Sequence, residues 1–302
     1  MWIVMLNGGL GNQMFQYIFA LYLAQHGARV VVDDSAFFGA HVEHKGFEVP
    51  LFFPSGVLPR LSEHFSPDVW KEMVDRKDRG VPIPEQLREG GLLLRCIRQE
   101  EAEPFLFMGE TIPVVCRDTE CILGLPQEQV LYFAGYWIDP LYYKEIQDSF
   151  LSIFSFPAFP KSTQAQIAQE IRATENATAI HVRRGDMAQL GRSNSPEYFR
   201  KAIKELDQLA RIEHFFLFSD DLDYCMKHAE ELGLAEIYSR LTAVTGNDGA
   251  EAYVDMQLMS LCRFRIADRS SFSQLAGVLC RVPGNLTTVW QPPTVTGFSV
   301  PV

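Results

Sequence analysis

Residues 179–186 read Ala-Ile-His-Val-Arg-Arg-Gly-Asp, and this stretch decides the fold. Apolar and polar side chains alternate over its first half and a glycine follows, which predicts a short strand that ends in a turn. Arg183 and Arg184 therefore stand at the carboxyl end of a strand. A guanidinium group presents a planar fork of donors that matches phosphate oxygens, and Asp186 is placed to hold one of the two forks. The alternative is an ordinary surface ion pair.

Helix and strand patterns alternate through the second half of the chain. The expected strands are 179–182, 215–218, 237–238 and 264–267, and the expected helices are 161–174, 250–261 and those that begin near Ser195, Asp221 and Ser270. Such alternation predicts a parallel sheet with helices on both faces. Ligands bind to sheets of this class outside the carboxyl ends of the strands.

Three polar clusters follow strands of this expected sheet. They are residues 183–186, Ser219-Asp220-Asp221, and the run 268–273, which contains Ser270, Ser271 and Phe272. Because the carboxyl ends of parallel strands lie at one edge, we expect the three clusters to meet and form a site. The serines in these clusters are also in position to be helix caps. Ser270 and Ser271 could instead bind a phosphate through backbone N–H groups and hydroxyls together.

A second candidate site lies at the start of the chain. The apolar run 2–6 ends at a glycine-rich turn, Asn-Gly-Gly-Leu-Gly-Asn-Gln at residues 7–13, and a helical pattern follows. A second strand at 28–32 ends in two aspartates, roughly 20 residues beyond the glycines, which is the arrangement of a dinucleotide-binding start. An NAD(P)-dependent oxidoreductase is therefore the main alternative function. Against it, Met14 stands where the third glycine of that pattern belongs.

Composition excludes several classes of function. The 302 residues carry a net charge of −11, which argues against a nucleic-acid partner because no basic excess is present. The six cysteines include no C-x-x-C pair, so we expect reduced thiols and no structural zinc. No stretch reaches the roughly 20 apolar residues of a membrane-spanning helix, so the expected location is the cytoplasm.

The chain is expected to divide into two domains. A strand pattern covers 130–136 and a helix pattern covers 140–154. Two prolines within 157–160 then interrupt the periodicity and predict a linker. The expected domains are therefore 1–158 and 159–302.

Ordered motifs make the chain similar to a known family. Four stretches resemble, in chain order, the motifs of the α-1,2-fucosyltransferases of glycosyltransferase family 11, and two further stretches resemble landmarks of that family. The four motifs are 8–17, 181–186, 218–221 and 270–273, and the landmarks are 135–137 and 255–262.

This resemblance implies a GT-B-like architecture, in which two Rossmann-like α/β domains face each other across a cleft. Domain 1–158 would bind the acceptor, and domain 159–302 would bind the donor GDP-fucose. The implied reaction is an inverting transfer of L-fucose to the 2-hydroxyl of a galactoside in bacterial surface-glycan synthesis, without a metal ion or other cofactor. The acceptor would be a galactose-containing oligosaccharide or a lipid-linked glycan, and the latter would suit peripheral association with the membrane.

The resemblance also implies roles for individual residues. Arg183 would hold the donor pyrophosphate, and Asn12 would approach the pyrophosphate or the fucose, so these two are the expected catalytic residues. His181 and Asp255 would read the guanosine, since a carboxylate accepts from the N1–H and N2–H of guanine, which adenine lacks. The other expected substrate-binding residues are Gly9, Gly11, Gln13, Arg184, Asp186, Ser219, Asp220, Asp221, Ser270, Ser271 and Phe272.

The sequence leaves the sugar preference and the general base open. Met187, Arg269 and Gln274 depart from the family pattern beside the expected donor site, and they bear on which sugar is transferred. The general base is one of several groups or an oxygen of the leaving phosphate. The side chains considered for it are Asp33, Asp34, His41 and His44. Because no base stands out, a nucleotide-sugar-binding protein without turnover is a third hypothesis.

Overall fold

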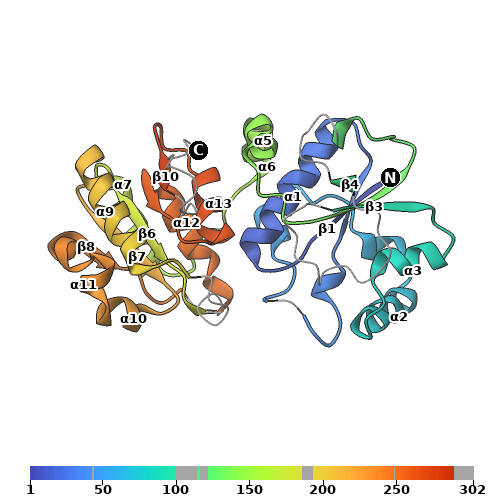
Figure 1. The fold of residues 1–302 in the computed structure, drawn as a ribbon, viewed down its shortest axis with the longest axis horizontal. Coiled ribbons are helices and arrows are strands. Elements are labelled where there is room, and N and C mark those ends of the chain that lie inside the picture. Colours follow the sequence, from blue (N-terminus) through green and yellow to red (C-terminus); the bar gives the residue numbers. More distant parts are fainter. Residues whose placement is uncertain (43, 99–113, 116–121, 186–192, 248, 289–302) are drawn as a thin grey trace. The chain divides into compact units, whose positions relative to one another are not determined.

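The structure is a computed structural model that describes residues 1–42, 44–98, 114–115, 122–185, 193–247 and 249–288 (Figure 1). The chain divides into two compact units, Met1–Pro157 and Ala158–Val302. Each unit contains one five-stranded sheet, and its helices pack on both faces of that sheet. Every strand pair in both sheets is parallel, which confirms the expected α/β class.

The sheet of the first unit has the strand order β2-β1-β5-β3-β4. Its strands are β1 (Trp2–Met5), β2 (Val30–Asp33), β3 (Leu94–Arg98), β4 (Val114–Val115) and β5 (Val130–Ala134). Its α-helices are α1 (Leu10–Gln25), α2 (Pro67–Asp78), α3 (Ile83–Glu89), α5 (Pro140–Glu145) and α6 (Gln147–Ile153). Three short 3₁₀ helices, η1 (Ser35–Phe37), η2 (Val49–Phe52) and η3 (Leu61–His64), lie between β2 and α2.

Aromatic packing fixes α1 against one face of this sheet. The ring of Phe19 on α1 stacks on that of Trp137 at 4.1 Å between centroids and lies 5.6 Å from that of Phe133 on β5. On the opposite face, a buried cluster joins strand side chains to Trp70 of α2 and Ile83 of α3. Packing on both faces holds the turn between β1 and α1 at the carboxyl edge of the sheet.

The sheet of the second unit has the strand order β10-β9-β6-β7-β8. Its strands are β6 (Thr178–Val182), β7 (Phe215–Ser219), β8 (Leu241–Ala243), β9 (Phe264–Ile266) and β10 (Leu286–Thr288). Its α-helices are α7 (Ser162–Ala173), α9 (Pro196–Ala210), α10 (Leu222–Lys227), α11 (Ala229–Leu232), α12 (Tyr253–Leu261) and α13 (Ser271–Val278), with 3₁₀ helices η5 (Ala235–Arg240) and η6 (Gly249–Glu251).

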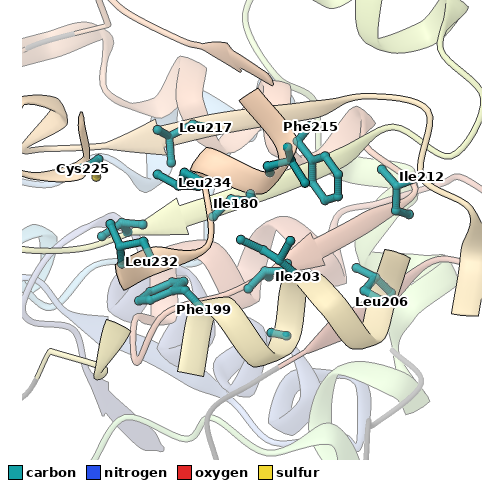
Figure 2. Packing of buried hydrophobic residues seen from close by; sticks show 14 of the residues in the cluster. Ile180, Phe199, Ile203, Leu206, Ile212, Phe215, Leu217, Cys225, Leu232 and Leu234 are labelled. Atoms are coloured by element: carbon teal, nitrogen blue, oxygen red, sulfur yellow. The ribbon is translucent and has the colours of Figure 1, made fainter. Parts of the chain in front are cut away.

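Helix α9 shows how the sequence builds this unit. Ser195 caps it by accepting from the backbone N–H of Tyr198, and Pro196 fits the first helical position, where no N–H is needed. Figure 2 shows its apolar stripe, which includes Phe199 and Ile203, packed against side chains of β6 and β7 such as Ile180. Each such buried side chain stabilises the fold by about 1.5–3 kcal/mol.

Several expected elements differ in the structure. The strand expected at 237–238 is wrong, because these residues lie in η5 and the strand is β8 at Leu241–Ala243. In η5 Ile237 is buried while the neighbouring Tyr238 is 69% exposed, and two residues are too few to distinguish this pattern from a strand. The single helix expected over 140–154 is α5 and α6, which meet at Ile146. Strands β3, β4 and β10 were not expected.

Candidate functional site

The carboxyl edge of the second sheet brings together the three polar clusters expected there. Asp268, which follows β9, accepts from the backbone N–H of Arg183 at 2.8 Å and from that of Asn194 at 3.3 Å. It also accepts from the backbone N–H of Arg269 at 2.7 Å and is only 2% exposed. Burial raises the pKa of the Asp268 carboxyl, and the three hydrogen bonds oppose that rise. Asp268 therefore ties the turn after β6 to the loop after β9.

Asp220 holds the side chain of Arg183. Its Oδ2 pairs with Nη1 of Arg183 at 2.8 Å, while Oδ1 accepts from the backbone N–H of Arg184 at 2.8 Å. A Cβ atom on Gly185 would lie 2.6 Å from Oδ2 of Asp220, so a larger residue here would displace the Asp220 carboxylate from this position. The side chains of Arg183 and Asp220 are 34% and 26% exposed, so the main effect of the ion pair is to orient Arg183 rather than to stabilise the fold.

The sequence suggested a similar part for Asp186, and this stays a prediction. Asp186 itself lies outside the described residues, as does Met187. The second arginine of the motif, Arg184, stacks over the ring of Tyr224 with its guanidinium carbon 3.8 Å from the ring centroid. Stacking of this kind leaves the planar edge of a guanidinium group able to donate hydrogen bonds.

His181 is buried on β6 beside Phe272, with ring centroids 5.9 Å apart. Burial, together with the nearby charge of Arg183, lowers the pKa of His181 to about 3. The imidazole is therefore neutral at physiological pH and carries one donor and one acceptor. Its Nδ1 is buried without a hydrogen-bond partner among the described residues.

Three residues predicted to bind a ligand make hydrogen bonds to backbone groups of the protein itself. The hydroxyl of Ser219 donates to the carbonyl of Val182 at 2.7 Å. Asp221 caps α10, and Ser270 caps α13, by accepting backbone N–H groups. The capping alternative is therefore correct for Ser270, whereas α10 is capped by Asp221 and not by Ser219. Ser271 and Phe272 are half-buried in the first turn of α13, where N–H groups at a helix start suit an anion.

A pocket of about 340 Å³ opens at the carboxyl ends of β7 and β8. Asp255, on the first turn of α12, lines it together with Asn247. The remaining lining residues are Ser219, Asp220, Asp221, Leu222, Asp223, Val244, Thr245 and Gly246. Nδ2 of Asn247 donates to Oδ1 of Asp255 at 2.6 Å. Sequence reasoning missed Asn247, because a single asparagine in a loop carries no pattern.

In the first unit, the side chains of the glycine turn make contacts that differ from the substrate contacts expected for them. Gly8 has φ of +73°, and a Cβ on it would lie 2.7 Å from Nδ2 of Asn12, so this position requires glycine. Gly9 is the residue before α1, and Gly11 is buried in its first turn. Gln13 is fully buried, and its amide bonds the carbonyls of Gly8 and Gly46 and the N–H of Glu48, at 2.9, 3.0 and 3.0 Å.

Gln13 is thus a residue that holds the 46–48 loop on the glycine turn, and both of its N–H groups are used for this. We therefore reassign it from substrate binding to a structural role. His44 is held next to the same turn, since a Cβ on Gly9 would lie 3.5 Å from Nδ1 of His44.

The acids considered for the general base are buried at the end of β2. Asp33 is 1% exposed and accepts from the Tyr132 hydroxyl at 2.5 Å, and Asp34 is 0% exposed and accepts from the Ser62 hydroxyl at 2.7 Å. Burial raises the pKa of both carboxyls. Neither carboxyl is therefore exposed to solvent. The same burial argues against the NAD(P) alternative, because Asp33 is not available to a ribose hydroxyl.

Metal-binding clusters, the state of the cysteines and membrane-spanning helices can each be assessed for the described residues. Among them there is no group of three or more His, Cys, Asp or Glu side chains that could hold a metal ion. The four cysteines that the structure describes, Cys96, Cys225, Cys262 and Cys280, are free and buried. In the described part of the chain, no helix has the length and apolar character needed to cross a bilayer.

Each unit has a parallel α/β sheet, the class of fold in which ligands bind at the carboxyl ends of the strands, and the second unit has arginines and a polar pocket at that edge. Comparison with known proteins identifies the family. Residues 107–289 match the model of glycosyl transferase family 11, and the chain belongs to this family. The resemblance stated from the motifs is confirmed.

Two curated relatives support this assignment, and one solved structure has a similar fold. The chain is 31% identical over 277 residues to an alpha-1,2-colitosyltransferase of Escherichia coli, covering 90% of this chain and 84% of that protein. It is 25% identical over 282 residues to the O-antigen biosynthesis glycosyltransferase WbnK of Escherichia coli, covering 89% and 86%. Its fold is similar to that of NodZ alpha-1,6-fucosyltransferase soaked with GDP-fucose, with a TM-score of 0.51 and 17% identity over 92% of this chain and 91% of that one.

Proposed function

We propose that the protein is an inverting α-1,2-fucosyltransferase that moves L-fucose from GDP-fucose to the 2-hydroxyl of a galactoside. The observation that carries this proposal is Arg183, a guanidinium group oriented by Asp220 at the carboxyl edge of a parallel sheet. The pocket that contains Asp255 opens at the same edge of the same sheet, where Asp220 is also part of its lining. A pyrophosphate site beside a nucleoside site is what a nucleotide-sugar donor needs.

In the proposed reaction, the acceptor oxygen attacks the anomeric carbon of the sugar while the bond from that carbon to the β-phosphate oxygen breaks. GDP leaves with the bonding electrons, and Arg183 stabilises the charge that develops on the phosphate oxygens. Backbone N–H groups at the start of α13, near Ser271, add to this stabilisation. A fixed guanidinium in this position makes a divalent ion unnecessary.

The proton of the acceptor hydroxyl must be removed in the same reaction. Since Asp33 and Asp34 are buried and hydrogen-bonded, we assign this proton to an oxygen of the departing phosphate or to His41 or His44, which are exposed. The first unit would supply the acceptor site, and Asn12 would approach the donor from it, as the GT-B-like architecture implies. Acceptors would be galactose-containing oligosaccharides or lipid-linked glycans, the latter reached by peripheral association with a membrane.

The donor sugar has a second candidate. The relative with 31% identity is named an alpha-1,2-colitosyltransferase, and colitose is L-fucose without its 3-hydroxyl group. We therefore propose that GDP-colitose competes with GDP-fucose as donor. Arg269, which departs from the family pattern, is exposed and follows Asp268, the residue that accepts from the backbone N–H of Arg183.

A donor competition tests this proposal directly. Purified protein is given equal amounts of GDP-fucose and GDP-colitose with a panel of galactosides, and the products are separated by mass spectrometry. Transfer of either sugar to a galactose 2-hydroxyl supports the proposed transferase activity and identifies the donor. If neither sugar is transferred to any acceptor while the protein still binds GDP, the protein is a nucleotide-sugar-binding protein without turnover. Thermal stabilisation by NADH but not by GDP would favour the oxidoreductase.

A further inference from the structure

A chain of hydrogen bonds leads from the start of α7 to Asp255 in the pocket. The backbone N–H of Lys161 donates to Oε1 of Gln164 at 2.9 Å, and Nε2 of Gln164 donates to Oδ1 of Asn247 at 2.8 Å. Nδ2 of Asn247 donates in turn to Oδ1 of Asp255 at 2.6 Å. Gln164 and Asn247 are 2% and 7% exposed, so water competes little for these bonds.

The donor-to-acceptor direction of this series of hydrogen bonds is fixed at Lys161. A backbone N–H can only donate, so Gln164 must turn Oε1 toward Lys161 and Nε2 toward Asn247. Glu251 requires the same orientation, because its Oε2 accepts from Nε2 of Gln164 at 3.0 Å. The same Oε2 pairs with Nζ of Lys161 at 2.6 Å, and the hydrogen bond from Lys161 lowers the pKa of Glu251.

Each amide therefore determines the orientation of the next. Asn247 must turn its oxygen toward Gln164, which leaves its N–H groups for Asp255. Asp255 therefore meets a donor, and the bond to its Oδ1 favours one rotation about its side-chain bonds. A carboxylate has about four acceptor positions, so the bond from Asn247 does not exhaust its capacity to bind a ligand in the pocket.

We propose that Gln164 and Asn247 are positioning residues that orient Asp255 toward the purine and so set the preference of the pocket for guanine. This inference rests on the proposed function, because it takes the bound nucleotide to be GDP. Guanine presents N1–H and the 2-amino group side by side, and a carboxylate accepts both only when its two oxygens lie close to the plane of the base. A rotated Asp255 would lose one of the two bonds.

Inosine diphosphate reports this loss, because hypoxanthine keeps N1–H and lacks the 2-amino group. The ratio of GDP to IDP affinity therefore measures whether Asp255 accepts both donors. One hydrogen bond to a charged acceptor corresponds to a preference of about 10- to 100-fold. Inorganic pyrophosphate has no base, so its affinity reports the Arg183 site alone.

The experiment measures the binding of GDP, IDP and pyrophosphate by calorimetry. In Asn247→Leu and Gln164→Met we expect the GDP/IDP ratio to fall from at least about 10 to below about 3, with pyrophosphate affinity unchanged. Lys161→Met is the matched control, because it removes the ammonium group but keeps the backbone N–H that orients Gln164. It should retain the preference for GDP.

The outcomes separate this inference from the proposed function. If Asn247→Leu and Gln164→Met keep the wild-type ratio, or lose pyrophosphate affinity together with it, the positioning role is wrong while the GDP site stands. If the wild-type protein binds no GDP, the proposed function itself fails. Should Asn247→Leu not fold, Asn247→Asp serves the same purpose, since it keeps the size of the side chain and turns only acceptor oxygens toward Asp255.

Discussion

Acid should destabilise this protein through His181, and the size of the effect follows from its burial. Its pKa is about 3 in the native state and 6.5 for an unperturbed histidine. Between these values the unfolded chain binds a proton that the native protein does not, so stability falls as the pH falls through this window. The slope reaches about 1.4 kcal/mol per pH unit, which gives about 2 kcal/mol between pH 6.5 and 5.

Urea unfolding of the wild type and of His181→Gln, at about pH 7 and about pH 5, measures this contribution. The wild type should lose about 2 kcal/mol more than the variant on acidification. Comparing the two proteins cancels the buried acids Asp33, Asp34 and Asp268, whose raised pKa values act in the opposite sense by favouring the native state at lower pH. Equal acid sensitivity of the two proteins would show that His181 is not held neutral by burial.

Three further predictions concern the two sites. Asp220→Asn should lower the transfer rate about 10-fold through misorientation of Arg183, with little change in melting temperature because the ion pair is partly exposed; steady-state kinetics and thermal unfolding check this, and an unchanged rate would contradict it. Gln13→Leu should destabilise the protein by about 1–3 kcal/mol, because it leaves backbone groups of the 46–48 loop unpaired; urea unfolding with no measurable change would reject the structural role of Gln13. EDTA should leave the transfer rate unchanged, and a loss that manganese restores would mean that a metal is needed.

The regular parts of the fold could be predicted from the sequence because a helix or strand that buries one face repeats apolar residues at its own period. Helix α9 carries its cap, its proline and its apolar stripe within one continuous stretch, β6 alternates apolar and polar side chains around Ile180 and Val182, and β7 is a short apolar run. Strand β8 has none of these signals, because it is a three-residue edge strand whose side chains are not fully buried. Its position is determined by pairing with β7, which no local pattern records.

The site was predictable to the extent that parallel topology brings strand ends together. The clusters after β6, β7 and β9 meet as expected, but the partners within them could not be assigned. The pairing of Asp220 with Arg183 was not predicted, since contacts between neighbouring strands depend on register and not on distance along the chain. Gln164 lies 83 positions before Asn247, and only the packing of α7 near α12 brings their amides together.

The most direct test of the central claim is the rate of sugar transfer by Arg183→Ala under saturating donor and acceptor. If this guanidinium compensates the charge of departing GDP, the rate should fall by about 10²–10³ or more, while the melting temperature stays close to that of the wild type. A rate within about tenfold of the wild type, in a folded variant, would remove Arg183 from the chemistry and contradict the account.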